Sequence, residues 1–305
     1  MKLLNRIFLE ELSFLLMCPA LLWQFIFLYM PLVILFAYSI LEYSPQKKFW
    51  IITFDYYARI FNSVYFNIIV NSFLVALTTA FFCFIIAYPL AYFLVIKTKQ
   101  KYRPLLLFSL ILPSWTSLIV QVYAWLFLFN ANGFLAQFLY STGILPRSMS
   151  LLNNSFSILV GMISVYLPFM ILPIYTVMEK MDKTLLEVSA DLGANRFETF
   201  KRVIFPLSLP GVYVGLILVF LPAFGEFAIP NLLGGSKLVF WGNLIVQKFL
   251  KSRDWKAGAA LAIIGVAIST IFMLLGLIIS KLIRIKRRVK KKEQSLKWGI
   301  NDGRK

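Results

Sequence analysis

The chain has 305 residues, of which 60% are hydrophobic and 14% are charged, and its formal net charge is +18. A soluble domain carries about 45–50% apolar and roughly 25% charged residues, so the composition excludes an ordinary soluble protein. The sequence has no histidine, two cysteines and no phosphate-binding glycine loop of the Walker type. It therefore predicts no catalytic site, no metal site and no ATP hydrolysis by this chain itself.

Long charge-free runs follow one another along the chain, and each exceeds the about 20 residues that cross a bilayer as a helix. The first run is too long for the core of a secretory signal and has no small-residue cleavage site after it, so we expect it to be retained. The sequence predicts an all-α polytopic membrane protein, a single domain over 1–305 with six transmembrane helices, at about 12–40, 68–96, 105–129, 158–179, 209–232 and 258–283.

The basic residues are divided unevenly between the two sides of this topology. If both termini lie on one side, 22 of the 31 Lys and Arg residues fall on that side and 9 on the other. The positive-inside rule then places both termini in the cytoplasm. We expect the basic tail over 284–305 to lie against anionic headgroups, so membrane lipid is a more natural partner than nucleic acid, the alternative for such a run.

Aromatic residues gather in the segments expected outside the membrane. An interfacial belt explains most of them, and a few are candidates for contact with a docking protein. The members of this belt are Phe49, Trp50, Tyr56, Tyr57, Tyr65, Trp241 and Trp255. The last expected span instead begins with small residues, Ala257–Ala260, which predict close packing on another helix.

The polar segment 180–208 separates the expected fourth and fifth spans. Glu187 and Asp191 are one helical turn apart and should face one side of a short helix. Gly193 lets the backbone turn where a side chain would obstruct it, and the residues that follow can form a second short helix. Pro206 marks the return to the membrane. The pattern predicts a compact helix–turn–helix element that docks on a soluble partner and transmits force.

Glu226 lies inside the expected fifth span, beside Gly225 and between Pro222 and Pro230. A charged side chain at the bilayer centre costs at least ~2.5–3.5 kcal/mol on insertion scales, unless it faces a wet cavity. The glycine and the prolines indicate a locally loosened helix. We therefore predict that Glu226 faces a substrate pathway and attracts a cation; a position at the outer membrane interface is the alternative.

The segment 187–206 resembles the coupling motif of bacterial ABC importer permeases. That motif is Glu-Ala-Ala, three residues, Gly, nine residues, then Ile-x-Leu-Pro. Here Glu187-Val188-Ser189 precedes Gly193, and Val203-Ile204-Phe205-Pro206 follows with the spacing intact, although the two alanines, the Ile and the Leu are replaced. The resemblance implies the type I ABC importer permease fold and an ATPase-coupling role for Glu187, Ser189, Asp191, Gly193, Val203 and Pro206.

Further stretches resemble the polyamine (spermidine/putrescine) permeases, and the length is that of the first of their two permease subunits. They are Cys18–Trp23, Tyr88–Tyr92, Trp115–Ser117, Tyr123–Trp125, Tyr166–Pro173 and Gly225–Phe227 with Leu233–Gly235. Two departures stand out. Gln121 occupies a position where that subfamily often has Arg, and Lys256 replaces the proline that often starts the last span.

The resemblance implies ATP-driven uptake by alternating access in the bacterial inner membrane. The implied partners are two ATPase subunits, which use ATP and Mg, a paralogous permease and an extracytoplasmic substrate-binding protein; this chain itself would bind no cofactor. Aromatic faces bind amine cations, so the candidate pathway residues beside Glu226 are Trp115, Tyr123, Trp125 and Tyr166. The alternatives are another cargo (ferric ion, thiosulfate or a cationic amino acid) and a standalone carrier or channel, which would leave the segment 187–206 unexplained.

Overall fold

The computed structural model describes residues 17–44, 49–60, 62–144, 146, 149–182, 184–235 and 238–302. Within these residues, six helices are long and apolar enough to cross a membrane. They are Met17–Ile40, Ser63–Lys97, Leu118–Ser141, Ser155–Glu179, Arg196–Phe224 and Trp255–Ile278. The predicted fold class is thus confirmed, while residues 12–16 of the expected first span lie outside the described residues.

The chain divides into two compact units, where the sequence predicts a single domain. The first comprises Met1–Phe66 with Leu244–Val266, and the second comprises Asn67–Asn243 with Ala267–Lys305. The boundaries fall inside helices α4, α13 and α14, so each of these helices contributes residues to both units.

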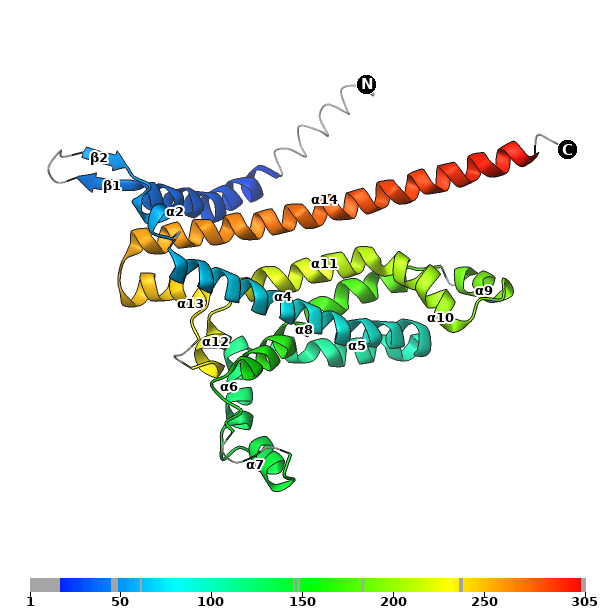
Figure 1. Cartoon of the computed structure of the whole chain (residues 1–305), viewed down its shortest axis with the longest axis horizontal. Coiled ribbons are helices and arrows are strands. Elements are labelled where there is room, and N and C mark those ends of the chain that lie inside the picture. Colours follow the sequence, from blue (N-terminus) through cyan, green and yellow to red (C-terminus); the bar gives the residue numbers. More distant parts are fainter. Residues whose placement is uncertain are drawn as a thin grey trace. The chain divides into compact units, whose positions relative to one another are not determined.

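The first unit combines the N-terminal helix, a small β-hairpin and segments from late in the chain (Figure 1). Ser39 and Tyr57 join their hydroxyls at 2.7 Å, and Lys256 forms an ion pair with Glu42 at 3.4 Å. The antiparallel hairpin, in which Leu41 is paired with Ile52, is not among the elements predicted from the sequence. The elements of this unit are η1 (Phe25–Tyr29, a π-helical turn), α2 (Met30–Ile40), β1 (Leu41–Ser44), β2 (Phe49–Ile52), α3 (Asp55–Ile60), η6 (Gln247–Lys251, π-helical) and the start of α14 (Trp255–Asp302).

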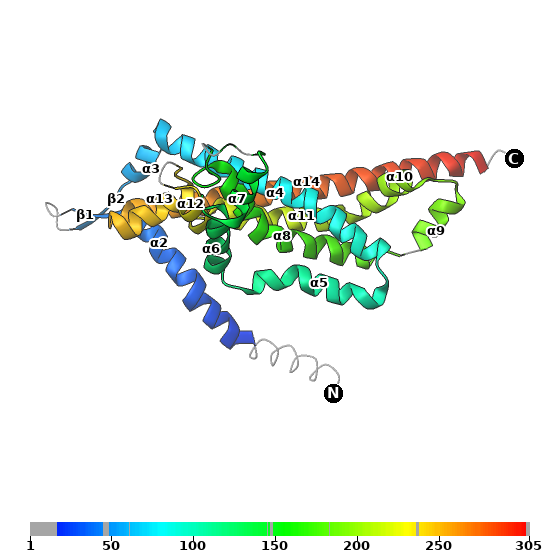
Figure 2. The same cartoon turned by 90° about the horizontal axis from the view of Figure 1, so that it is seen from below.

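The second unit is built on the packing of α8 (Ser155–Glu179) against α11 (Phe205–Phe224), which lie side by side in Figures 1 and 2. Its other elements are most of α4 (Ser63–Tyr92), η2 (Phe93–Lys97, π-helical), η3 (Gln100–Tyr102), α5 (Arg103–Ile111), η4 (Leu112–Trp115), α6 (Leu118–Phe129), α7 (Phe134–Ser141), α9 (Thr184–Asp191), α10 (Arg196–Thr199), η5 (Phe200–Ile204, π-helical), α12 (Ala228–Leu233), the first half of α13 (Trp241–Val246) and the part of α14 from Ala267 on.

Two glycines of α11 let this helix approach α8 closely. A Cβ on Gly211 would lie 2.6 Å from the carbonyl oxygen of Pro173, and one on Gly215 would lie 2.6 Å from the sulfur of Met170. In a membrane, apolar burial gives little drive for helix association, so close packing at small residues supplies it instead. The small residues that the sequence marks in the last span are buried as well, with Ala259 and Ala260 at most 1% exposed.

The uninterrupted helix expected over 105–129 is replaced by two helices. α5 ends at Ile111, a 3₁₀ turn follows, and α6 begins at Leu118. The Gln121 side-chain amide donates to the carbonyl oxygens of Pro113 at 2.6 Å and Thr116 at 3.3 Å. The carbonyl oxygen of Pro113 also accepts the backbone N–H of Thr116 at 3.2 Å and its hydroxyl at 2.7 Å, so Gln121 and Thr116 together bond the backbone at this break, as a break among apolar residues requires. Gln121, which stands where the polyamine permeases often have Arg, therefore has a structural role.

Trp241 does not fit the expected interfacial belt. Its side chain is only 1% exposed, and its backbone N–H donates to the Ser72 hydroxyl at 2.8 Å. It begins α13 inside the packed part of the second unit, so the interfacial interpretation was wrong for this residue. Trp255, in contrast, is 58% exposed, as an interfacial residue should be.

Candidate functional site

Glu226 lies in a break between two helices and not inside a continuous one. α11 ends at Phe224, Gly225 caps it, and α12 begins at Ala228. Pro222 lacks a backbone N–H and weakens the last turn of α11, which favours an end at this point. The expected span over 209–232 is thus one long helix followed by a short one.

Both carboxylate oxygens of Glu226 accept hydrogen bonds. Oε1 accepts backbone N–H groups of Phe227 at 3.0 Å, Ala228 at 2.8 Å and Ile229 at 3.5 Å, and Oε2 accepts the Tyr166 hydroxyl at 2.5 Å. The side chain therefore satisfies the first N–H groups of α12, where a negative charge is also favourable. Glu226 is only 9% exposed, so in this conformation it is bonded within the protein.

The backbone around Glu226 is enclosed by the start of α13. A Cβ on Gly242 would collide with the carbonyl oxygens of Gly225 and Glu226, so only glycine fits there. The Asn243 amide donates to the carbonyl oxygen of Phe227 at 3.0 Å. Asn243 Oδ1 and Trp241 Nε1 are buried polar atoms without a hydrogen-bond partner among the described residues. Sequence reasoning missed these neighbours, because they belong to α13, a later element that only the folding of the chain brings beside Glu226.

The structure brings together two of the five predicted pathway residues, Glu226 and Tyr166. A third, Trp125, lies on α6, which packs against α8 and α12, and its indole N–H donates to the Ser164 hydroxyl at 2.7 Å. Trp115 and Tyr123 are 71% and 54% exposed in the isolated chain, and no described contact joins either of them to Glu226. Their role in a pathway stays a prediction.

The segment 180–208 forms the helix–turn–helix element that its sequence predicts. Gly193 follows α9 with φ +78°, and its N–H donates to the carbonyl oxygen of Ala190 at 2.9 Å. The N–H of Ala194 donates to the carbonyl oxygen of Ser189 at 3.0 Å. This is the glycine cap of a Schellman motif. Nothing lies within 4 Å of a Cβ built at Gly193. The glycine is thus needed for its positive φ angle. The sequence leads to the expectation that a side chain here would collide with its surroundings, and within this chain it would not.

Polar contacts hold the two short helices together. Ser189 and Thr199 join their hydroxyls at 2.9 Å. Asn195 and Glu198 form a reciprocal capping box at the start of α10. α10 then continues through η5 into α11, so that Arg196–Phe224 is one helical segment. Figures 1 and 2 show α9 and α10 at one end of the α8–α11 pair and α12 at the other.

The element exposes apolar side chains beside its acidic ones. Leu192 is 82% exposed, Phe197 70% and Val188 53%. Glu187 and Asp191 are also exposed, whereas Ser189 is buried. Exposed apolar residues that are rimmed by polar ones mark interaction surfaces. Of the other coupling candidates, Val203 and Pro206 are half-buried at the junction with α11.

A small cavity of about 220 Å³ lies beside α9, which contributes Leu186 and Glu187 to its wall. Arg103 is 6% exposed beside it, and its guanidinium donates to the carbonyl oxygens of Thr98, at 3.2 Å, and Val95. Thr184 donates to Asp182 at the start of α9, and these hydrogen bonds hold the pKa of that carboxyl below its ordinary value. The cavity is lined by residues from three segments, among them Ile96, Arg103, Met178, Glu179, Asp182 and Glu187.

Residues 70–286 match the family of binding-protein-dependent transport system inner membrane components. The chain belongs to this family. It is 36% identical over 271 residues to the spermidine/putrescine transport system permease protein PotB of Salmonella typhimurium, covering 88% of this chain and 92% of the relative. The corresponding protein of Haemophilus influenzae is 39% identical over 242 residues, covering 79% and 84% of the two chains.

The fold of this inner membrane component is also that of a solved bacterial ABC transporter involved in the import of the acidic polysaccharide alginate. The TM-score is 0.76 at 18% identity, over 92% of this chain and 99% of the other. A second structure of an alginate transporter, in complex with an alginate-bound periplasmic protein, gives a TM-score of 0.73 at 19% identity, over 89% of this chain and 94% of the other. The predicted membership of the ABC importer permeases is confirmed, and the chain is a multi-pass inner-membrane protein.

Proposed function

We propose that this chain is a permease subunit of an ATP-driven importer of polyamines such as spermidine and putrescine. The observation that carries the proposal is the 36% identity to a spermidine/putrescine permease over 88% of the chain. The aligned region is long enough to include both the break at Glu226 and the α9–α10 element. The chain itself would carry out no catalysis.

The α9–α10 element would couple the permease to a separate ATPase. Its exposed Leu192 and Phe197 offer an apolar surface to a groove on that partner, and Glu187 and Asp191 offer charges at its rim. The capping box and the Ser189–Thr199 contact make the element stiff. A stiff element transmits movement to α11. Closure of two ATPase subunits around ATP and Mg would therefore shift α11 and switch the pathway between its inward-open and outward-open states.

Glu226 would supply the negative charge that attracts an amine cation. Oε1 is occupied by backbone donors, but among the described residues Oε2 accepts only the Tyr166 hydroxyl, and a carboxylate oxygen has two acceptor positions. An ammonium group could therefore join Tyr166 at Oε2 once the site opens. Asn243 Oδ1 is a second acceptor near this break, without a described partner. Trp115, Tyr123 and Trp125 remain candidates for aromatic contact with the rest of the substrate.

The assembly would include a paralogous permease and an extracytoplasmic substrate-binding protein. The distribution of Lys and Arg supports an orientation with both termini in the cytoplasm and α9–α10 on the same side, as contact with an ATPase would require. In this orientation Glu226 lies toward the outer end of α11, where substrate released by the binding protein would arrive first.

Uptake of labelled spermidine tests the proposal. Cells carry this chain with its neighbouring transport genes, and the paired strain carries a defective ATPase. We expect uptake that depends on the ATPase and is blocked by putrescine, but not by ferric ion, thiosulfate or arginine. Absence of spermidine uptake in a strain with an assembled complex would refute the polyamine substrate. Uptake that is indifferent to the ATPase would refute the coupling.

A further inference from the structure

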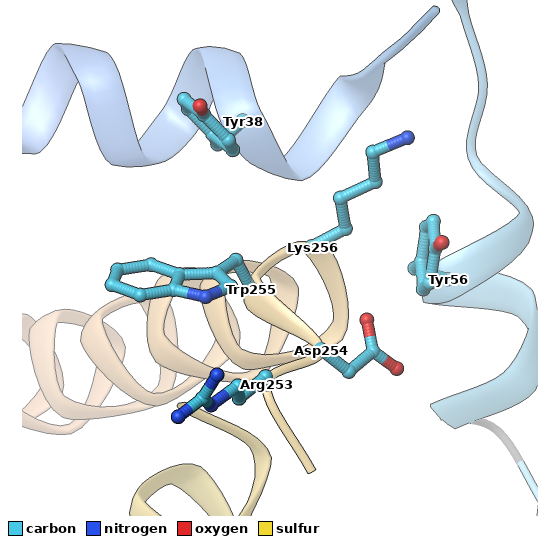
Figure 3. A pocket seen from close by; sticks show the side chains of 6 residues that line it. All are labelled: Tyr38, Tyr56, Arg253, Asp254, Trp255 and Lys256. Carbon is cyan, nitrogen blue, oxygen red and sulfur yellow. The ribbon is translucent and has the colours of Figure 1, made fainter. Parts of the chain in front are cut away.

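A polar cleft of about 510 Å³ lies in the first unit, where α2, α3 and the start of α14 meet. Figure 3 shows Trp255 beside Tyr38, with the Arg253 guanidinium on the far side of the indole from Tyr38 and Lys256 extending toward Tyr56. Tyrosine and tryptophan are the side chains that gather at the level of lipid headgroups. The cleft thus combines interfacial aromatics with two cationic groups and the carboxylate of Asp254.

An apolar groove of about 350 Å³ adjoins this cleft. Tyr38 and Trp255 line both, so the two cavities meet at these aromatic rings. The groove runs along the membrane-spanning part of α2, and its wall includes Met30, Pro31, Ile34, Leu35 and Phe249. An apolar channel that leads from within a predicted span to a polar cleft has the shape and polarity of an acyl chain joined to a headgroup.

The charge of this region favours an anionic headgroup. The described part of the first unit holds five cationic side chains, Arg59, Lys248, Lys251, Arg253 and Lys256, and three acidic ones, Glu42, Asp55 and Asp254. Two of the acids have partners: Glu42 pairs with Lys256, and Asp254 accepts the backbone N–H of Ala257 at 3.2 Å. Arg253 makes no ion pair among the described residues, and its guanidinium is available to a ligand.

Two further features concern the backbone at Arg253 and the side of the membrane on which it lies. Its φ is +51°, a left-handed conformation that costs a non-glycine residue about 1–2 kcal/mol. The backbone bonds on either side hold this turn, from Ser252 N–H to Gln247 and from Asp254 N–H to Lys248, both at 2.9 Å. In the orientation proposed above, this segment also lies outside, where the positive-inside rule predicts few cations. A cationic residue in a strained turn on that side indicates a ligand.

We infer that the cleft and the groove together form a binding site for an anionic phospholipid of the surrounding bilayer. One acyl chain lies in the groove along α2, and the phosphate lies in the cleft against Arg253, beside the ring of Trp255. The lipid would fasten α2 to the start of α14. The inference needs only the membrane location and not the identity of the transported substrate.

Lipid retention by the intact importer tests the inference. The complex is purified in detergent, stripped of lipid and mixed with phosphatidylglycerol, phosphatidylcholine of the same acyl chains, or glycerol phosphate, and bound molecules are counted by native mass spectrometry. Arg253→Asn removes the guanidinium and keeps a residue that tolerates the left-handed turn. Ile34→Trp fills the groove at a position that is 47% exposed, and Lys101→Gln removes an exposed cation of the second unit as the control.

We expect retention of phosphatidylglycerol about tenfold better than of phosphatidylcholine, which corresponds to about 1.4 kcal/mol. Both variants should lose about tenfold in retention, and the control should not change. Unchanged retention in the two variants would overturn the inference. Sensitivity to Arg253→Asn alone, with competition by glycerol phosphate, would leave only an anion site. Normal lipid retention with lost stimulation of ATP hydrolysis by the binding protein would assign the surface to that protein instead.

Discussion

The two ends of α11 are built in opposite ways. At one end, the break around Glu226 is buried, and the carboxylate is bonded to Tyr166 and to the start of α12. At the other, α9–α10 leaves Leu192 82% and Phe197 70% exposed, although its own backbone turns are fully bonded. The first end is buried and bonded largely within this chain. The second presents exposed apolar side chains beside acidic ones, as interaction surfaces do.

This difference predicts how the two ends respond to substitution. Changes at the exposed end should alter coupling and leave the isolated permease stable, because few contacts within the chain depend on them. Changes at the buried end should alter transport through the pathway and leave the ATPase contact intact. Each of the following substitutions is chosen to separate these outcomes.

Gly193→Val should have the largest effect. A β-branched residue at φ +78° is strained whatever the space around it, so the turn between α9 and α10 would open. We expect the ratio of uptake to ATP hydrolysis to fall at least about tenfold. Gly193→Asn is the matched control, because Asn tolerates this angle, and it should stay within about twofold of the unchanged protein. Equal coupling in the two variants would show that the turn is unimportant.

Glu226→Gln should reduce polyamine uptake about tenfold per assembled complex, the size expected when a bond to a charged group is lost. The complex should still assemble, since the Gln carbonyl can accept one of the N–H groups of α12. Glu42→Gln is the control, because it removes a carboxylate whose side chain is 43% exposed from the pair with Lys256. If both variants transport at the same rate, Glu226 has no special place in the pathway.

Leu192→Ala should weaken the retention of the ATPase severalfold, because an exposed apolar residue at the centre of an interface is worth about 1–2 kcal/mol. The melting temperature of the permease alone should not move. Ile144→Ala, at another exposed apolar position, provides the comparison and should leave ATPase retention unchanged. A fall in the melting temperature with unchanged retention would place Leu192 in the fold and not in the interface.

Tyr166→Phe should have the smallest effect, about fivefold on uptake. It removes one hydroxyl that bonds to Glu226 and keeps the ring, and such a bond contributes about 1 kcal/mol net. Tyr140→Phe, which removes a hydroxyl bonded to Met149 in a loop, serves as the reference. An effect on the apparent KM for spermidine, with no change in ATPase retention, would support a position beside the substrate.

Much of the fold could be predicted from the sequence, because charge-free runs report burial in lipid directly. The α9–α10 element could be predicted because its glycine and its helix caps are local signals. The two breaks could not. Hydropathy averages over the interruption before Leu118, where Thr116 and Gln121 bond the carbonyl of Pro113, and over the one at Glu226, where the carboxylate itself caps α12. Both depend on hydrogen bonds that a composition window does not register.

The site was predicted in part for the same reason. Glu226 stands out in any sequence reading because it is acidic among apolar residues, but its partners Tyr166 and Asn243 lie on other helices. The burial of Trp241 likewise follows from Ser72, 169 positions away in the chain. Such pairs are set by tertiary packing, so only the structure could identify them.

The continuity of Arg196–Phe224 has a mechanical consequence. Its 29 residues form a helical segment about 43 Å long at 1.5 Å per residue, which includes the π-helical turn η5. Over this length, a tilt of about 5° relative to α8 would displace the far end by about 4 Å. That displacement exceeds the 2.5 Å between Tyr166 and Glu226, so a small rotation that begins at the α10 end would be enough to part them.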